Sequence, residues 1–210
     1  MIAVNDDWSG VPGIVGYLGD NPSSSVTGVN PTTLVGDSTG AVDVIANQTN
    51  PNTLTAGGVA EFDALANPVV ALQGSGTADF PSLIINLDTS GYQNIQFSCN
   101  LRDVDGSADN AAQQVAVQYR VGTSGTWTNL PGGYVADASS GPSLATLVTP
   151  VSVTLPASAN NQAHIQIRVL TTNAPGSDEW IGVDDISATG DLLPTPVENS
   201  TWGRIKNTVN

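Results

Sequence analysis

The sequence predicts an all-β protein, an antiparallel β-sandwich of jelly-roll type with long loops and a short C-terminal tail. Three observations support this fold class. Apolar residues almost never recur with the 3.6-residue period of a helix, they alternate with polar residues in several short runs, and clusters of Gly, Pro, Asn, Asp and Ser separate those runs. Many short strands joined by turn-rich connections are typical of sandwiches and jelly rolls.

The expected strands follow from alternation, because side chains of a strand point to its two faces in turn. Residues 8–60 hold few alternations beyond 42–46 and are expected to form long loops and edge strands. The clearest run is 115–121, where Val, Val, Tyr and Val alternate with Ala, Gln and Arg; the runs 151–155 and 165–169 repeat this pattern. Each predicts a half-buried strand. The segments 83–87 and 180–186 are further candidates.

The chain is expected to form one domain over residues 1–190, because no linker divides its strand-rich part. The composition changes after Gly190, and residues 191–210 are expected to be a tail that docks on its own sandwich or on a neighbouring subunit. In this tail, Trp202, Ile205 and Val209 have helical spacing behind Ser200, which favours a short helix or an extended segment. These three apolar residues are the candidates for assembly contacts.

The charge balance excludes two classes of partner. The chain has 210 residues, with 19 Asp and Glu against 5 Lys and Arg, so its formal net charge is −14. An acidic surface repels phosphate, and we therefore expect no binding to nucleic acid or to anionic membranes. No apolar run approaches the roughly 18 residues of a membrane helix, so no membrane insertion is expected. The first residues lack the basic and apolar regions of a signal peptide.

The chain has one cysteine, Cys99, which has no partner for an internal disulfide. Alternation places it on the same strand face as Ile95, Phe97 and Leu101. A buried, inert thiol is therefore expected.

Five stretches between Ala71 and Gly190 carry a resemblance to known proteins. They are Ala-Leu-Gln-Gly-Ser-Gly-Thr-Ala-Asp at 71–79, Leu-Arg-Asp-Val-Asp-Gly-Ser-Ala-Asp-Asn at 101–110, Gln-Tyr-Arg-Val-Gly at 118–122, the segment 142–150, and Asp-Glu-Trp-Ile-Gly-Val-Asp-Asp-Ile at 178–186. Together they resemble an uncharacterised β-sandwich module of secreted multidomain bacterial proteins, some of which also carry nuclease or hydrolase domains. The closing Gly-Val-Asp-Asp-Ile-Ser resembles the last strand of MAM-type and lectin-like jelly rolls. The resemblance implies an extracellular or cell-surface protein.

Two patterns could carry catalysis, and both favour a structural interpretation. Residues 36–40 match Gly-x-Ser-x-Gly, but their flanks indicate two strands joined by a turn, whereas a nucleophilic serine needs a strand-to-helix turn. His164, the one possible base, lies in a polar strand position. Glu179 and Asp185 would share a strand face as a glycosidase pair needs, yet the Glu-x-Asp-x-x-Glu strand of jelly-roll glycosidases is absent. We expect no enzyme activity.

Acidic loops suggest a structural calcium site, because Ca²⁺ is bound by six to eight oxygen atoms. Asp103, Asp105 and Asp109 form one cluster and share only the opening of an EF-hand loop. Asp184 and Asp185 form a second cluster in the final strand. The alternative is that these carboxylates cap turns or accept hydrogen bonds from backbone amides.

Glycan binding would need exposed aromatic rings flanked by polar side chains. Trp127, Tyr134 and Trp180 are the candidates, although a sandwich core could use most of the few aromatic residues. Asn47 and Asn199 fit the acceptor pattern for N-glycosylation, a short motif that also arises by chance.

The strands carry little charge to protect the edges of the sheets. The single lysine, Lys206, lies in the tail, and the thirty residues between Asp137 and Arg168 have no formal charge. An open edge pairs readily with another chain. The leading hypothesis is therefore a non-enzymatic extracellular subunit that assembles with copies of itself, as a filament, by strand or tail exchange. The alternative is a carbohydrate-binding, calcium-stabilised module of a secreted bacterial enzyme.

Overall fold

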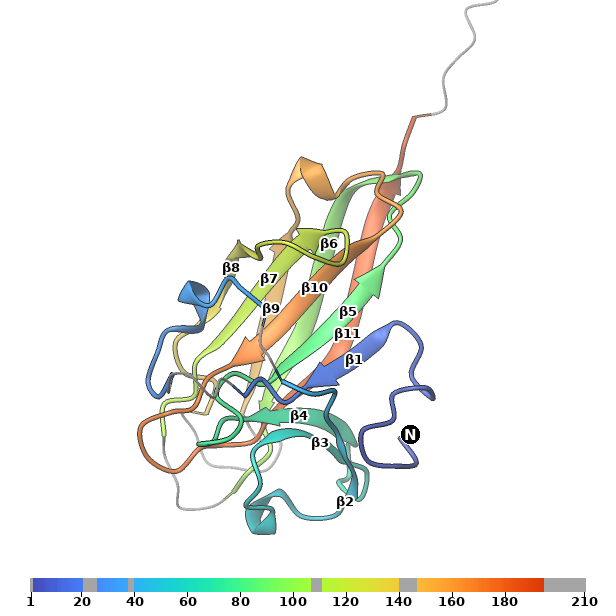
Figure 1. Cartoon of the computed structure of the whole chain (residues 1–210). Coiled ribbons are helices and arrows are strands. Elements are labelled where there is room, and N and C mark those ends of the chain that lie inside the picture. Colours follow the sequence, from blue (N-terminus) through green and yellow to red (C-terminus); the bar gives the residue numbers. More distant parts are fainter. Residues whose placement is uncertain (1, 21–25, 38–39, 107–110, 140–146, 195–210) are drawn as a thin grey trace, which may run out of the picture.

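Two β-sheets packed face to face form the protein, as the sequence predicts (Figure 1). The computed structural model describes residues 2–20, 26–37, 40–106, 111–139 and 147–194. In spatial order, the five-stranded sheet consists of β1 (Ile14–Tyr17), β5 (Ser82–Leu87), β10 (Ile165–Thr171), β7 (Val115–Val121) and β8 (Thr128–Val135). The six-stranded sheet consists of β2 (Ile45–Gln48), β3 (Gly58–Phe62), β4 (Val69–Gln73), β11 (Ile181–Leu192), β6 (Tyr92–Asp103) and β9 (Val148–Thr154).

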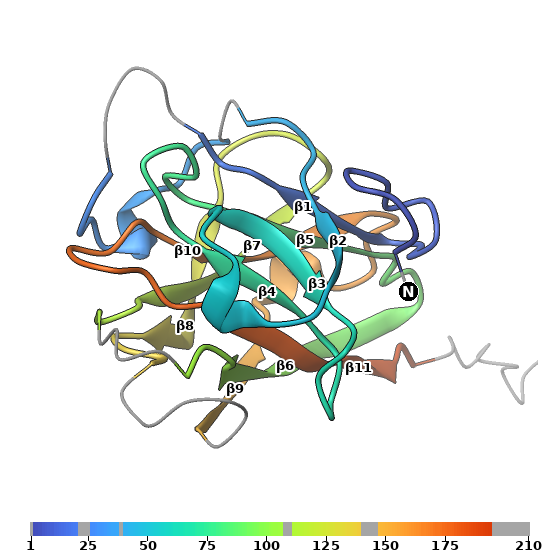
Figure 2. The same ribbon diagram turned by 90° about the horizontal axis from the view of Figure 1, so that it is seen from below.

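The neighbouring strands are antiparallel, with one exception among those described. β2 and β3 run parallel. The connection between them, residues 49–57, contains the short 3₁₀ helix η2 (Pro51–Thr53). It returns the chain to the end of the sheet where β2 began (Figure 2). The other helical segments in the described residues are two 3₁₀ turns, η1 (Pro31–Thr33) and η3 (Ala157–Ala159). No helix in the described part of the chain is long and apolar enough to cross a membrane.

The predicted runs become strands where alternation is clear. β7 spans the predicted run 115–121, and β10 extends the run that begins at Ile165. β11 continues to Leu192, so its pairing with β6 includes the first two residues of the expected tail, Asp191 and Leu192. As expected, β1 and β2 from the first 60 residues are edge strands.

The main core lies between the sheets and consists of the inward-facing apolar residues of both. Val115, Val117 and Tyr119 contribute from β7, and Phe97, Cys99 and Leu101 contribute from β6. Burial raises the pKa of the Cys99 thiol to about 12, so the thiol stays protonated. The prediction of a buried, inert cysteine is confirmed.

The outer face of the five-stranded sheet is covered as well, which contradicts the prediction of half-buried strands at 115–121 and 165–169. In β9 buried and exposed residues alternate, as predicted for the run 151–155. Residues 26–37, which include η1, lie over β7 and β10. Gln118 is fully buried and Arg168 is 2% exposed, although both lie on the polar side of the alternation. Alternation identifies the polar face of a strand, but it does not reveal that a distant loop covers that face.

The predicted hairpin around residues 36–40 is also wrong. The residues before it form η1, whose Asn30 side chain accepts a hydrogen bond from the Thr32 backbone, and after it Val42 makes a single bridge to Tyr17. Ser38 lies outside the described residues. Pro31 at the first helical position favours the turn over a strand, because proline presets the backbone angle of a helix start.

The described edges of the sheets are protected, although they carry little charge. β1 and β2 have four residues each, and β8 and β9 contain Pro131 and Pro150. Short edge strands and proline both oppose the addition of another chain, since proline has no amide hydrogen to donate. The expectation of unguarded edges is therefore wrong for these strands.

Candidate functional site

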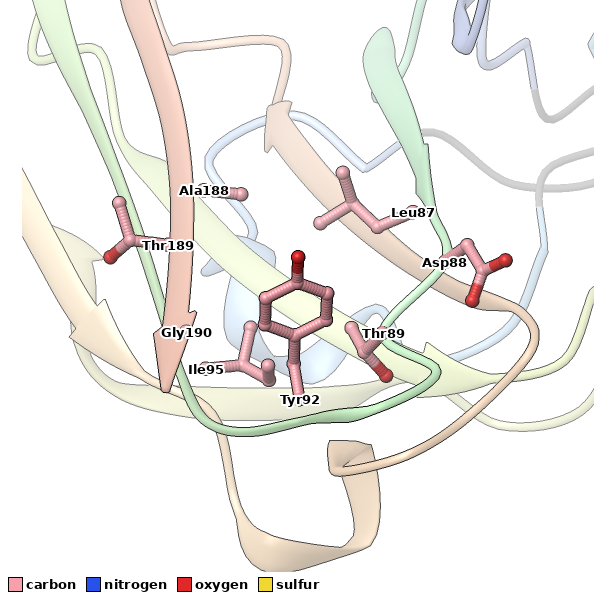
Figure 3. A pocket seen from close by; sticks show the side chains of 8 residues that line it. All are labelled: Leu87, Asp88, Thr89, Tyr92, Ile95, Ala188, Thr189 and Gly190. Carbon is pink, nitrogen blue, oxygen red and sulfur yellow. The ribbon is translucent and has the colours of Figure 1, made fainter. Parts of the chain in front are cut away.

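The candidate site is a cavity at the end of the sandwich, where β5 leads into β6 and where β11 ends. Its volume is about 430 Å³. Figure 3 shows its eight lining residues: Leu87, Asp88, Thr89, Tyr92, Ile95, Ala188, Thr189 and Gly190. The Tyr92 ring stands between the β11 residues and the Leu87–Thr89 segment, with its hydroxyl group directed into the cavity.

The turn before β6 fixes the position of Tyr92. The Asp88 carboxylate accepts a hydrogen bond from the Ser90 backbone at 2.8 Å, and the Tyr92 amide donates to the Thr89 carbonyl at 2.9 Å. Gly91 has a positive φ of 81°, a conformation that glycine adopts without strain. The sequence Asp-Thr-Ser-Gly thus forms a tight turn that delivers Tyr92 to the cavity.

A β-bulge turns Tyr92 toward the same side as Ile95. Thr189 pairs with Gln96 and Asp191 pairs with Gln93, so β6 carries one more residue than β11 between these pairs. Asn94 adopts a positive φ of 54° at this place. An extra residue reverses the alternation of the residues before it, and Tyr92 consequently lines the cavity although it lies an odd number of positions from Ile95.

The cavity combines an exposed aromatic ring with a few polar groups. Tyr92 is 42% exposed, and apolar side chains of Leu87, Ile95 and Ala188 lie around it. Hydrogen bonds from Ser90, and then the charge of His164, lower the pKa of Asp88, so this carboxylate is ionised at neutral pH. The arrangement offers an apolar face for stacking, with the Tyr92 hydroxyl group and the Asp88 carboxylate at the same site for hydrogen bonding. The Thr89 hydroxyl group already donates to the Ala159 carbonyl at 2.7 Å.

The two tryptophans predicted as glycan platforms are buried, and that prediction is wrong for both. Trp127 is 1% exposed, and its indole nitrogen donates to Asp37 at 2.8 Å. Trp180 is fully buried on the outer side of the six-stranded sheet, where it packs edge-on against Phe62 at 5.4 Å. The third candidate, Tyr134 on β8, is 40% exposed and donates a hydrogen bond to Gln114.

Tyr92 is not among the predicted site residues, because alternation alone places it on the opposite face from Ile95. The turn Asp-Thr-Ser-Gly directly before an aromatic residue was the available signal. The β-bulge that aims the ring into the cavity has no clear mark in the sequence, apart from an asparagine, which tolerates positive φ better than most residues.

The predicted calcium ligands do not converge among the described residues. Asp184 forms an ion pair with Arg102 at 2.7 Å, and Asp185 accepts a hydrogen bond from Asn100 at 2.8 Å. Asp103 and Asp105 are buried at the end of β6, where Asp103 accepts from the Asp105 backbone. Asp109 lies outside the described residues, and in the rest no group of three or more His, Cys, Asp or Glu could hold a metal ion. A calcium site stays a prediction.

The predicted catalytic patterns are not assembled in the described part of the chain. Glu179 is buried before β11 begins, whereas Asp185 is exposed at an irregular step of β11 and has a positive φ of 50°. The His164 ring nitrogen Nε2 lies 3.0 Å from the Asn86 amide oxygen. Asp37, the described acidic residue of the 36–40 motif, contacts Arg120.

A second cavity, also of about 430 Å³, lies between the η2 region and the loop before β11. Its polar lining includes Asn52, Gln73, Asp105, Asn173 and Asp178. Burial raises the pKa of Asp178 to about 6, against the opposing hydrogen bond from the Ala174 backbone. None of the described residues that line this cavity is aromatic, so they offer no stacking surface like that of the Tyr92 cavity.

The two predicted glycosylation positions differ in what the structure describes. Asn47 is exposed on the edge strand β2, with a positive φ of 57°. Asn199 lies outside the described residues, as do the assembly candidates Trp202, Ile205 and Val209. Modification of Asn47 and assembly through the tail both stay predictions.

Of the comparisons with known proteins, the one with solved structures finds proteins similar to this chain. No protein-family model and no curated protein matches this chain. The chain is similar to TmCBM61 in complex with β-1,4-galactotriose, at 9% identity over 60% of this chain and 72% of that one, with a TM-score of 0.36. It is similar to CBM28, a module specific for non-crystalline cellulose, at 13% identity over 70% and 98% of the two chains, with a TM-score of 0.41.

A third similar structure is an enzyme, the Stig cyclase Fisc from Fischerella sp. TAU. Its identity is 15% over 87% of each chain, with a TM-score of 0.44. Likenesses this distant carry no argument about function, and they include both binding modules and a cyclase. The function proposed for this chain therefore rests on its own residues.

Proposed function

We propose that this protein is a non-catalytic β-sandwich module that binds glycans through the Tyr92 cavity. The observation that carries the proposal is an aromatic ring, 42% exposed, whose hydroxyl group is directed into a cavity that Asp88 and apolar side chains also line. Sugars have apolar faces that stack on aromatic rings and hydroxyl groups that hydrogen-bond at their edges. The Tyr92 cavity offers both kinds of contact within one site.

The size and the construction of the cavity support this proposal. A volume of about 430 Å³ falls within the roughly 300 to 1,000 Å³ of small-ligand sites. Tyr92 and Ile95 lie on β6, and Thr189 lies on the neighbouring β11, so most of the site is built on paired strands. Rigid elements hold a binding site with little loss of entropy when the ligand arrives.

An extracellular location belongs to the same proposal. The resemblance of residues 71–190 to modules of secreted bacterial proteins supports it, since that resemblance implies an extracellular or cell-surface protein. The predicted filament subunit has less support, because short strands and prolines protect the described edges.

Replacing Tyr92 tests the proposal. Purified protein is screened on a glycan array, and the best oligosaccharide is then titrated by calorimetry against the wild type and Tyr92→Ala. We expect Tyr92→Ala to weaken binding about tenfold or more, since loss of the stacking surface removes about 1.4 kcal/mol or more. Circular dichroism checks that the variant is folded.

Tyr134→Ala is the matched control, because Tyr134 has a similar exposure but lies on β8. We expect it to bind the oligosaccharide as the wild type does. Binding that survives Tyr92→Ala and is lost in Tyr134→Ala would move the site to β8. The absence of any glycan signal from the wild type would contradict glycan binding itself.

A further inference from the structure

A separate cavity of about 360 Å³ lies on the outer face of the five-stranded sheet. Its polar lining comes from Tyr17, Asp37, Ser82, Arg120, Thr123, Gln166 and Arg168. These residues belong to β1, β5, β7, β10 and the neighbouring loops, and none of them lines the Tyr92 cavity.

Two arginines meet at this cavity around Trp127. The guanidinium carbon of Arg120 lies 4.1 Å from the centre of the indole ring, and that of Arg168 lies 4.4 Å from it. Cations over the face of tryptophan are attracted by its quadrupole. The three side chains therefore form a fixed group, in which neither arginine is free to swing into solvent.

The charges of this group do not cancel among the described residues. Arg120 forms an ion pair with Asp37 at 2.9 Å. Arg168 donates to neutral acceptors, namely the side-chain oxygen of Gln118 and the carbonyl groups of Leu34 and Gly36. Two buried guanidinium groups thus face one carboxylate, in a chain whose net charge is −14. A buried charge is costly unless it is paired, so the site is suited to a further negative group.

Several hydrogen-bond donors at the cavity have no acceptor among the described residues. Nε and Nη1 of Arg120 bind Gln166, Asp37 and Gly125, but Nη2 makes no hydrogen bond to a described residue. The same holds for the side-chain hydroxyl groups of Ser82 and Thr123, both of which line the cavity. The cavity therefore presents one cationic donor and neighbouring hydroxyl groups.

We propose that this cavity binds an anionic monosaccharide unit, a sugar carboxylate or a sugar phosphate, with its oxyanion beside Nη2 of Arg120. Charged donors such as arginine bind carboxylate and phosphate oxygens most strongly. The volume exceeds the need of an inorganic ion, since one water occupies only about 30 Å³ in the liquid, and the hydroxyl groups of Ser82 and Thr123 suit those of a sugar ring. This inference does not depend on glycan binding at Tyr92.

The experiment uses the full chain carrying Tyr92→Ala, so that the other cavity contributes no signal. Glucuronate, glucose 6-phosphate, neutral glucose and inorganic phosphate are titrated separately and followed by two-dimensional NMR. We expect at least one of the two acidic sugars to shift the signals of Arg120 and Thr123, and to bind about tenfold or more tightly than glucose. Comparison of glucuronate with glucose 6-phosphate identifies which oxyanion is preferred.

Two substitutions with opposite effects sharpen the test. Arg120→Gln should abolish binding, whereas Asp37→Asn should tighten it about tenfold, since removal of the competing carboxylate leaves more positive charge. Asp191→Asn makes the same change of net charge at an exposed position on β11 and should leave the affinity unchanged. Thr123→Ala, a change at a loop residue, should weaken binding and keeps the test valid if Arg120→Gln does not fold.

Three results would overturn the proposal. Glucose could bind as tightly as glucuronate and glucose 6-phosphate, which would remove the role of the charge. Inorganic phosphate could bind while neither acidic sugar does, which would show an ion site alone. Asp37→Asn could fail to tighten binding of the preferred acidic sugar, which would separate the ligand from Arg120.

Discussion

Trp127 fixes two guanidinium groups against the outer face of the five-stranded sheet. Both guanidinium groups lie against its ring, while its indole nitrogen donates to Asp37. Burial opposes the charge of Asp37, but hydrogen bonds from Arg120 and Trp127 and the charges of both arginines outweigh it and lower the pKa of this carboxyl group. One residue thus organises the charges of the proposed anion site.

Asp43 is a partly buried carboxyl group with a different role. Its Oδ2 accepts a hydrogen bond from the Val59 backbone at 2.7 Å, and a β-carbon at Gly58 would lie 2.2 Å from the same oxygen. Burial, together with the nearby charge of Asp6, raises the pKa of Asp43 to about 6 despite the Val59 hydrogen bond. The carboxyl group therefore takes up a proton more readily in the folded state than in the unfolded state.

This difference predicts a dependence of stability on pH. Because the folded pKa lies above the unfolded value of about 3.9, the contribution of Asp43 to stability is complete below that value and is lost as the pH rises through about 6. We expect the free energy of unfolding of the wild type, relative to Asp43→Asn, to fall between pH 4.5 and pH 7. Urea unfolding at several pH values measures it.

The control for this experiment is Asp7→Asn at an exposed position, where hydrogen bonds from Ser9 lower the pKa of the carboxyl group. Because a carboxyl group with a lowered pKa contributes its stability above the unfolded pKa, the difference between wild type and this variant should stay nearly constant over the same pH range. A constant difference for Asp43→Asn as well would show that Asp43 does not hold a proton in the folded protein.

The segment 26–37 is the element that converts a two-layer sandwich into a protein with a buried outer face. Val26 packs with Phe80, Ala116 and Leu170 in a small apolar cluster on that face. Gln118 of β7 joins the segment to the sheet, because its amide nitrogen lies 3.3 Å from the Leu34 carbonyl oxygen and its side-chain oxygen accepts from Arg168.

Gln118→Ala should therefore loosen this segment. The change removes the side-chain oxygen that accepts from Arg168 and the amide nitrogen that donates to the Leu34 and Pro31 carbonyl groups. This loss of buried hydrogen bonds should cost about 2 to 4 kcal/mol of stability. Urea unfolding measures this loss, and hydrogen exchange followed by mass spectrometry should show faster exchange in residues 26–37.

Gln114→Ala is the matched control. The Gln114 side chain accepts a hydrogen bond from the exposed Tyr134, and its change should cost less than about 1 kcal/mol. Equal losses in the two variants would contradict a special role of Gln118 in holding the segment.

The β-bulge near Asn94 shows how a single extra residue defines a site. It leaves β6 and β11 paired over most of their length and reverses the alternation at the start of β6 alone. Without it, Tyr92 would point away from Ile95 and the cavity would lose its aromatic ring.

At the scale of the whole molecule, assembly would depend on two features, the edges of the sheets and the C-terminal tail. The described edges are short strands or strands that contain proline, so the predicted exchange of edge strands has little support. The tail hypothesis is independent of the edges, because Trp202, Ile205 and Val209 lie outside the described residues.

Size-exclusion chromatography and electron microscopy of the full chain and of a chain that ends at Pro194 test the tail hypothesis. This truncation keeps β11 complete. Assembly through the tail predicts oligomers or filaments for the full chain and a monomer for the truncated one. A monomeric full chain, or oligomers that survive the truncation, would rule it out.

Local patterns in the sequence were sufficient for the fold class, most strands and the burial of Cys99. Alternation and turn residues report directly on which backbone conformation each short segment adopts, and every strand that alternates clearly was found near its expected place. Local patterns did not show that Trp127 and Trp180 are buried, because burial depends on what packs against a face.

The candidate sites depend on contacts between segments far apart in the chain. Tyr92 lines a cavity because the pairing of β6 with β11 contains a bulge. Arg120 and Arg168 are buried because residues 26–37 cross their strands. Such contacts form only when the sheets have paired and packed. The amino-acid sequence therefore specified an acidic β-sandwich, while the register of the sheets and the covering loop decided which of its side chains are available to a ligand.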